Sequence, residues 1–222
     1  MKRTLKYFGS REELREKIID TLESEDFFII SSAFDNLVEL RDVSDGDYYR
    51  LLDELGANVY GEEDVTLERT FVDFLIANNL TVAVAESCTG GMLSSKIVDV
   101  PNASKVFYEG VVTYSNNAKM ERLMVNGKTL ESHGAVSSET AKEMAYGLLC
   151  ENVDLAISTT GIAGPDGGTD EKPVGLVYIG LAYKGCEPIS IECHFQGKRN
   201  EIRQSATNTA LFCAYDYLNN NL

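Results

Sequence analysis

The sequence predicts an α/β protein in which a small α/β module precedes a layered α/β/α sandwich with a mixed sheet. The charge-free run TVAVA at residues 81–85 is typical of a strand that is buried on both faces. Strand and helix patterns alternate after residue 66, as they do in α/β layers. Residues 1–70 differ from the rest, because they hold 18 acidic and 9 basic residues.

The N-terminal module is expected to contain two helices and four short strands. Ser10, with Glu13 three residues later, forms a capping box, and apolar residues then recur at every fourth position. Gly56 ends the second helix. No catalytic set of residues is evident in this segment. The expected elements are a strand at 4–8, a helix from Ser10 to 22, a hairpin of strands at 27–33 and 37–40, a helix at 48–55 and a strand at 58–60.

The acidic stretch GEED at residues 61–64 is the predicted linker, which gives domains at 1–62 and 63–222. A second domain of this length can bury a substantial core. Its last two strands are expected to form an antiparallel pair. The expected elements are helices at 66–79, after Gly90-Gly91, at 118–124, at 138–149 and at 200–217, and strands at 81–85, 106–114, 155–160, 176–183 and 189–195.

Three predicted strands end in polar loops, at residues 86–91, 114–119 and 160–168. Ligands of open α/β sheets bind at the carboxyl ends of strands, so these loops are expected to converge on one pocket. The first loop, ESCTGG, precedes a helix whose first N–H groups lack partners, which would place an oxyanion or phosphate site beside Ser87. Cys88 is a rival nucleophile, because a helix N-terminus lowers the pKa of a thiol. A helix cap with a tight turn is the alternative interpretation.

Lys119 is the predicted general base. It lies near the start of a helix, where the dipole and partial burial both lower the pKa of an amine. The neutral amine that results is the form that accepts a proton. Tyr114 is expected to relay a proton or to hold this amine; the alternative is a solvated lysine beside a packed aromatic ring. His133, in a turn, and His194, in an edge strand, are not favoured as bases.

The loop at residues 161–168, GIAGPDGG, is rich in glycine and proline. Close approach of a backbone to a ligand requires glycine more often than a plain turn does, so this loop is a predicted ligand loop. It lacks the residue order of a nucleoside-triphosphate loop.

The composition restricts the class of protein. The formal charge of −15 argues against a nucleic-acid surface and leaves room for one bound phosphate on a small molecule. No apolar run is long enough to span a membrane, and no secretion signal is evident. The five scattered cysteines suggest neither a zinc site nor a disulfide framework, which favours a cytoplasmic location.

Five collinear motifs resemble the CinA C-terminal domain, the nicotinamide-nucleotide amidase family, from about residue 63 to the end of the chain. They are AESCTGG (85–91), EGVVTYSNNAK (109–119), HGAVS (133–137), GIAGPDGG (161–168) and KPVG (172–175). The resemblance implies hydrolysis of the carboxamide of nicotinamide mononucleotide to nicotinic acid mononucleotide and ammonia. By motif match Ser87 is the nucleophile, assisted by Lys119 and Tyr114, and Thr160 takes the Ser/Thr position of the substrate loop.

The resemblance also implies a homodimer. No metal-ligand cluster is evident in the sequence, so activity without a metal or cofactor is expected. The oxyanion is expected to lie on N–H groups of residues 88–91, together with the loop at 161–164. The residues expected to contact the substrate are Cys88, Thr89, Gly90, Gly91, Thr160, Gly161, Ile162, Ala163 and Gly164. The alternative function is a non-catalytic nucleotide-binding or regulatory protein that keeps the pocket.

The first sixty residues resemble a shortened form of the KH-type module that precedes this domain in full-length CinA proteins. The matching pieces are TLKYFG and NVYGEED. The module lacks a GxxG loop and is acidic, so no binding of RNA is expected. The larger domain related to molybdopterin-binding proteins is not in this sequence, and its metal-dependent ADP-ribose pyrophosphatase activity is expected to be absent.

Overall fold

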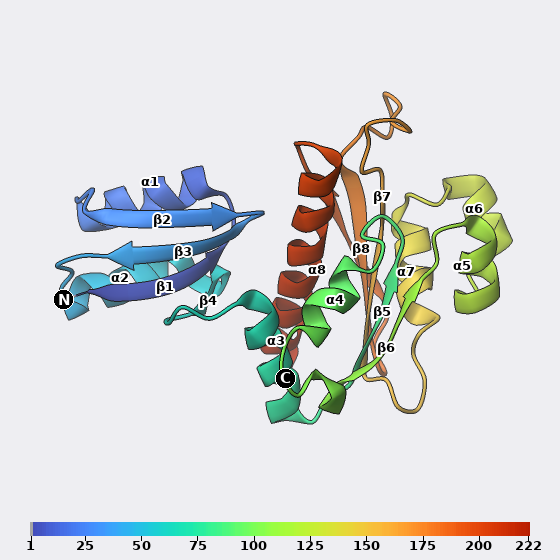
Figure 1. The fold of residues 1–222 in the computed structure, drawn as a ribbon, viewed down its shortest axis with the longest axis horizontal. Coiled ribbons are helices and arrows are strands. Elements are labelled where there is room, and N and C mark those ends of the chain that lie inside the picture. The colour runs from blue at the N-terminus through green and yellow to red at the C-terminus, as the bar shows by residue number, and fades with distance from the viewer. Residues whose placement is uncertain (1) are drawn as a thin grey trace. The chain divides into compact units, whose positions relative to one another are not determined.

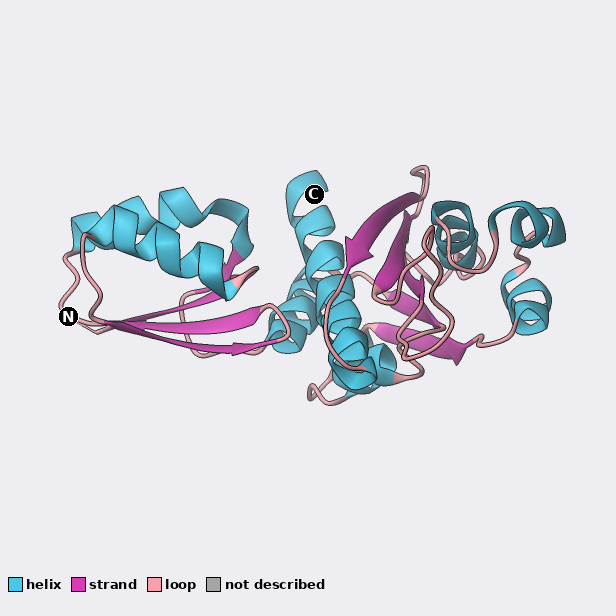
Figure 2. Cartoon of the chain, turned by 90° about the horizontal axis from the view of Figure 1, so that it is seen from above, coloured by secondary structure: helices cyan, strands magenta, loops and turns pink. Residues whose placement is uncertain are grey.

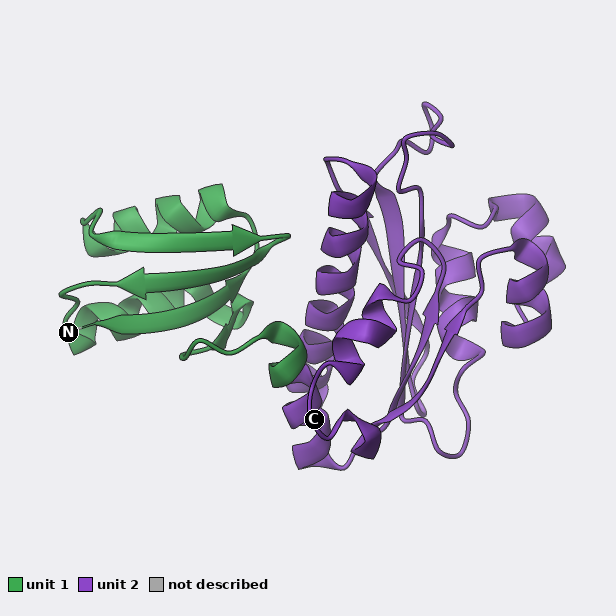
Figure 3. Ribbon diagram, in the orientation of Figure 1, with its two compact units in different colours: residues 1–70 green, residues 71–222 purple. Residues whose placement is uncertain are grey.

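The computed structural model describes residues 2–222. The chain forms two compact units, residues 1–70 and 71–222 (Figure 3). The division falls inside helix α3 (Leu67–Asn78).

Unit 1 is a four-stranded antiparallel sheet, in the order β2-β3-β1-β4, with two helices on one face (Figure 2). Its core includes Leu5, Leu14 and Val38. The predicted cap is present, because the Ser10 side chain accepts the Glu13 N–H. The KH-type resemblance of this unit stays a prediction. The elements are β1 (Arg3–Phe8), α1 (Arg11–Leu22), β2 (Phe27–Ser32), β3 (Asp35–Leu40), α2 (Asp45–Leu55), a 3₁₀ turn (Gly56–Asn58) and β4 (Val59–Gly61).

Unit 2 is the predicted α/β/α sandwich. Its sheet has the order β6-β5-β7-β8-β9. Strands β6, β5 and β7 are parallel to one another, β8 is antiparallel to β7, and β9 is antiparallel to β8. Helices α4 and α8 cover one face, and α7 covers the other with α5 and α6 outside it (Figure 1). The elements after α3 are β5 (Val82–Glu86), α4 (Met92–Val98), a 3₁₀ turn (Ala103–Lys105), β6 (Phe107–Val112), α5 (Asn116–Leu123), α6 (Gly127–His133), α7 (Ser138–Tyr146), β7 (Leu155–Gly161), β8 (Leu176–Tyr183), β9 (Ile189–His194) and α8 (Arg199–Asn221).

Strand β5 lies between two parallel neighbours and is buried along its whole length, as its uncharged sequence predicts. Ala83 and Ala85 pack into the core beside Met144 of α7. The alternate residues Val82 and Val84 face the other helical layer, since side chains alternate along a strand. Because β5, β6 and β7 are parallel, their carboxyl ends lie at one edge of the sheet. The predicted convergence of the three loops is therefore confirmed.

Helix α6 is an element that the sequence analysis did not predict. It has only one buried side chain, Leu130, so no apolar periodicity marks it. The carboxylate of Glu143, on α7, accepts the N–H of Asn126 and the hydroxyl of Thr129 at its start. His133 thus ends a helix rather than lying in a plain turn. A short helix that depends on a distant carboxylate leaves no local signal.

Gly147 ends α7 three residues before the predicted end, and it contacts the helix that carries Lys119. A Cβ at this position would lie 2.0 Å from the carbonyl oxygen of Leu123. Gly147→Ala is therefore expected to lower the free energy of unfolding by about 2–3 kcal/mol, measured by urea denaturation. Gly127→Ala is the matched control, because its Cβ would meet only Met120, at an ordinary 3.5 Å. Equal stability of the two variants would contradict the prediction.

Candidate active site

A cavity of about 210 Å³ lies at the carboxyl ends of β5, β6 and β7. The nucleophile, base, tyrosine and threonine that the sequence predicts all line it. They come from three segments, after β5, after β6 and at the end of β7, and the parallel arrangement of these strands brings them together. The lining residues are Ser87, Cys88, Tyr114, Lys119, Ala135, Val136, Thr160, Gly161, Ala163 and Arg199.

Ser87 and Lys119 are in direct contact, with Nζ of the lysine 3.0 Å from Oγ of the serine. Ser87 directly follows β5, and its N–H donates to the Thr159 carbonyl, which continues the pairing with β7. Lys119 is the fourth residue of α5, whose start is capped by the Ser115 side chain. The lysine side chain is buried.

Burial lowers the pKa of Lys119 from 10.5 to about 8, and the nearby Cys88 opposes this shift. Nζ donates to the carbonyl oxygens of Thr113, at 2.8 Å, and Tyr114, at 3.3 Å. A neutral amine has two N–H groups and one lone pair. The protonated amine also donates to the Ser87 hydroxyl oxygen. When it loses that proton, its two remaining N–H groups can stay on the two carbonyls while the lone pair faces the Ser87 hydroxyl. This arrangement suits a general base.

Cys88 does not have the properties of a nucleophile. Its thiol is buried, and burial raises its pKa to about 12, although nearby N–H groups and Thr159 act in the opposite direction. A thiol with this pKa holds almost no thiolate at neutral pH. The expectation that the helix N-terminus activates Cys88 is wrong, because loss of hydration outweighs the effect of the helix end.

The N-terminus of α4 is also not open to a ligand. The carboxylate of Glu86, which is fully buried, accepts the N–H groups of Gly91, Leu93 and Ser94. Thr89 is buried as well, and its hydroxyl contacts Glu86 and Thr159 instead of the cavity. The expected oxyanion or phosphate site at this helix end is thus filled by a side chain of the protein. Contact of the substrate with Thr89 or with the N–H of Gly91 is not compatible with these bonds.

Tyr114 lines the cavity, but its ring is 63% exposed. Its backbone carbonyl, not its hydroxyl, accepts a hydrogen bond from the Lys119 amine. The hydroxyl lies 3.4 Å from a guanidinium nitrogen of Arg199, which donates to it. Tyr114 thus holds the Lys119 amine through its backbone carbonyl, whereas its side-chain hydroxyl contacts Arg199.

The glycine-rich loop at 161–168 has structural reasons for its glycines. A Cβ on Gly161 would lie 2.6 Å from the Val177 side chain, and one on Gly164 would lie 2.6 Å from Val174. Gly164 also has a φ of +73°, which disfavours other residues. Of the expected contacts in this loop, Gly161 and Ala163 line the cavity, whereas the backbone of Ile162 pairs with Gly175 and Leu176 at the start of β8. Packing against residues 174–177 accounts for this glycine pattern without a ligand.

The sequence profile of the CinA C-terminal domain matches residues 64–218. The chain belongs to the CinA C-terminal domain family. It is 53% identical over 160 residues to a protein of Clostridium novyi named as competence-damage inducible, covering 72% of this chain and 38% of that protein. A similarly named protein of Acetivibrio thermocellus is 44% identical over 214 residues, covering 90% of this chain and 52% of that protein. The chain thus spans about half or less of the length of these relatives.

Two solved structures have the same fold as the CinA domain of this chain. The competence/damage inducible protein CihA of Agrobacterium tumefaciens aligns with a TM-score of 0.66 at 37% identity, covering 70% of this chain and 94% of that chain. A CinA superfamily protein of Escherichia coli aligns with a TM-score of 0.64 at 35% identity, covering 68% and 87%. Within residues 2–222, no helix has the length and hydropathy needed to cross a membrane.

Three lining residues of this CinA domain were missed as site residues. Ala135 and Val136 belong to the HGAVS motif, and Thr160 donates its hydroxyl to the Ala135 carbonyl. Arg199 opens α8 and donates to the Gly164 carbonyl at 2.7 Å. The HGAVS motif was a signal for the first two residues. No local pattern marks Arg199, which reaches the cavity from the far end of the sequence.

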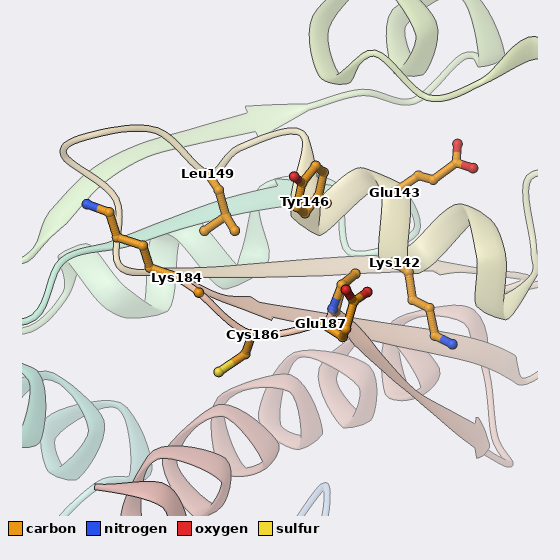
Figure 4. A pocket seen from close by; sticks show the side chains of 9 residues that line it. Lys142, Glu143, Tyr146, Leu149, Lys184, Cys186 and Glu187 are labelled. Carbon is orange, nitrogen blue, oxygen red and sulfur yellow. The ribbon is translucent and has the colours of Figure 1, made fainter.

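A larger cavity, of about 570 Å³, lies between α7 and the connection from β8 to β9 (Figure 4). Because β8 is antiparallel to β7, this connection is at the opposite end of the sheet from Ser87. It holds none of the residues predicted for the CinA chemistry. Its lining residues are Lys142, Glu143, Tyr146, Leu149, Lys184, Gly185, Cys186, Glu187 and Pro188.

Proposed function

We propose that the CinA domain of this chain is an amidase that hydrolyses the carboxamide of nicotinamide mononucleotide. The observation that carries the proposal is the buried Lys119 amine, with its lowered pKa, 3.0 Å from the Ser87 hydroxyl. A serine becomes a nucleophile when a base lies within hydrogen-bond reach. The choice of nicotinamide mononucleotide as the substrate rests on the five motifs that resemble the amidase family.

In the proposed reaction, Ser87 Oγ attacks the carboxamide carbon while Lys119 takes the hydroxyl proton. The tetrahedral intermediate collapses when the lysine ammonium gives that proton to the departing nitrogen, which leaves as ammonia. Water then adds to the acyl-serine ester, and Lys119 again takes and returns the proton, releasing the carboxylate. We assign the oxyanion to the N–H groups of Cys88 and Ala163, which line the cavity, since Glu86 occupies those of Gly91, Leu93 and Ser94 and the Ile162 N–H donates to the Leu176 carbonyl.

The size of the cavity suggests how a nucleotide would lie. Sites that enclose a whole drug-sized ligand measure about 300–1,000 Å³. At about 210 Å³, this cavity suits the nicotinamide ring, with the ribose phosphate extending past the rim. Arg199 lines that rim and is the cation that we assign to the phosphate.

Arg199→Met is expected to raise KM for nicotinamide mononucleotide by about 10- to 100-fold, because a charged hydrogen bond to the phosphate is lost. KM for nicotinamide riboside, which has no phosphate, should change far less. Steady-state ammonia release with both substrates measures the two effects. Lys198→Met removes the same charge one residue away, outside the cavity, and is the matched control. An equal rise in KM for both substrates would show that Arg199 instead holds the loop at 161–168 in place, through its bond to the Gly164 carbonyl.

The first test of the function is ammonia release from nicotinamide mononucleotide by the full chain, with nicotinic acid mononucleotide identified as the product. Ser87→Ala, purified identically, controls for a contaminating amidase. Nicotinamide riboside and free nicotinamide define the substrate range. Binding of the nucleotide without release of ammonia would contradict the proposal and favour a non-catalytic nucleotide-binding protein.

A further inference from the structure

We infer that Glu86 is a positioning residue that holds Ser87 in place by fixing the turn between β5 and α4. The inference rests on the proposed amidase function, since it concerns the same serine. Glu86 does not line the cavity and has no contact with Lys119. Its influence therefore has to pass through the backbone of residues 87–94.

The Glu86 carboxylate accepts five hydrogen bonds, all from the segment that follows it. Oε2 lies 2.9 Å from the N–H nitrogen of Gly91 and 3.1 Å from that of Leu93. It also accepts the Thr89 hydroxyl at 2.7 Å. Oε1 accepts both the N–H and the hydroxyl of Ser94, at 2.8 and 2.7 Å. Because the side chain is fully buried, no water can replace these bonds.

The carbonyl groups of the same turn are held by a residue of opposite charge. Arg203, on α8, donates from Nε to the Cys88 carbonyl at 3.1 Å and from Nη2 to the Thr89 carbonyl at 2.7 Å. The Ser87 N–H donates to Thr159. Glu86 thus binds N–H groups where the turn enters α4, and Arg203 binds the two carbonyls that directly follow Ser87.

Only a carboxylate suits the position of Glu86. Its five partners are all donors, and a carboxylate offers two acceptor oxygens and no hydrogen. The amide of Gln would keep one oxygen and turn an NH₂ group toward the other donors. Asp keeps the charge, but its shorter stem reaches fewer of them. Displacement of a reacting group by about 1 Å can cost about 100-fold in rate.

The test compares Glu86→Gln and Glu86→Asp with the wild type in ammonia release from nicotinamide mononucleotide. For Glu86→Gln we expect kcat to fall about 100-fold, with KM within about 3-fold and the pH–rate midpoint unchanged, because Lys119 and the cavity walls stay in place. Glu86→Asp should recover part of kcat. Glu143→Gln is the matched control, since Glu143 accepts the Asn126 N–H at the start of α6 and does not line this cavity.

Two further measurements separate this inference from the choice of substrate. Phosphonylation of Ser87 by a fluorophosphonate should slow about as much as kcat in Glu86→Gln, even if nicotinamide mononucleotide is not the substrate. Hydrogen exchange of residues 87–94 should speed up in the same variant. Ser94→Ala, which removes one of the five donors, gives a milder change should Glu86→Gln fail to fold.

The inference is overturned if exchange in residues 87–94 rises while kcat and phosphonylation stay within about 3-fold of the wild type. It is also overturned if Glu143→Gln loses as much kcat as Glu86→Gln. If the wild type is phosphonylated at Ser87 but releases no ammonia, nicotinamide mononucleotide is not the substrate. The role of Glu86 is then tested by the phosphonylation rates alone. A wild type that is not phosphonylated at all would refute both.

Discussion

Ser87→Ala is expected to slow ammonia release from nicotinamide mononucleotide by about 10⁴-fold or more, because no acyl-enzyme can form without the hydroxyl. The alanine leaves Lys119 in its bonds to the Thr113 and Tyr114 carbonyls, so the fold should not change. Rates with saturating substrate, together with a search for the acyl-enzyme by mass spectrometry, measure the effect.

Cys88→Ala is the matched variant for this prediction. Cys88 lines the same cavity, and its thiol is the alternative candidate for the nucleophile. It should keep kcat within about 10-fold of the wild type, because a thiol with a raised pKa supplies little nucleophile. Inactivity of Cys88→Ala beside an active Ser87→Ala would move the nucleophile by one residue and refute the assignment.

Lys119→Met is expected to lower kcat by about 100- to 10,000-fold, the range typical of a lost general base. Lys119→Arg should be no better, because a guanidinium keeps its proton at any working pH. In the wild type, kcat/KM should rise with pH to a plateau with a midpoint near 8, since only the neutral amine accepts the serine proton. Rescue by arginine would show that the positive charge, and not a base, is needed.

The same pKa has a consequence for stability. The unfolded chain binds a proton at Lys119 up to about pH 10.5, whereas the folded chain loses it near pH 8. Between these values the unfolded state holds more protons, so the contribution of Lys119 to the free energy of unfolding rises with pH, by about 3 kcal/mol in all. The difference between wild type and Lys119→Met in urea denaturation, from pH 7 to 10.5, isolates this contribution from tyrosine and cysteine titration. A difference that stays constant with pH would contradict the lowered pKa.

Much of the fold follows from local patterns in the sequence. The uncharged TVAVA run lies in β5, between its two parallel neighbours, as predicted, because burial on both faces favours apolar residues; Glu86, the last residue of the strand, is buried with five hydrogen-bond donors. Ser87, directly after β5, and Lys119, on the helix that follows β6, meet at the carboxyl edge of the sheet because the two strands are parallel. The α/β/α layering follows from the same reasoning.

The remaining features depend on contacts that a local pattern does not contain. Glu86 resembles a polar loop residue in the sequence, yet it fills the helix N-terminus that was expected to bind an anion. The raised pKa of Cys88 depends on burial, which only the packed structure defines. Arg199 lines the cavity although it is 112 residues after Ser87 in the sequence, so no local pattern connects the two. The glycines at 161–168 predict a ligand loop, but three of them, Gly161, Gly164 and Gly168, are required by the close approach of residues 174–177.

The separation in sequence between contacting groups also bears on how the site forms during folding. Ser87 and Lys119 are 32 residues apart, whereas Tyr114 and Arg199 are 85 apart. Closing the longer loop costs about 1 kcal/mol more in chain entropy. The nucleophile and its base therefore come from one contiguous segment, from β5 to α5, which is complete before the ribosome has made α8. Changes of length after residue 123 can alter the rim that selects the substrate while leaving the pair that performs the reaction intact.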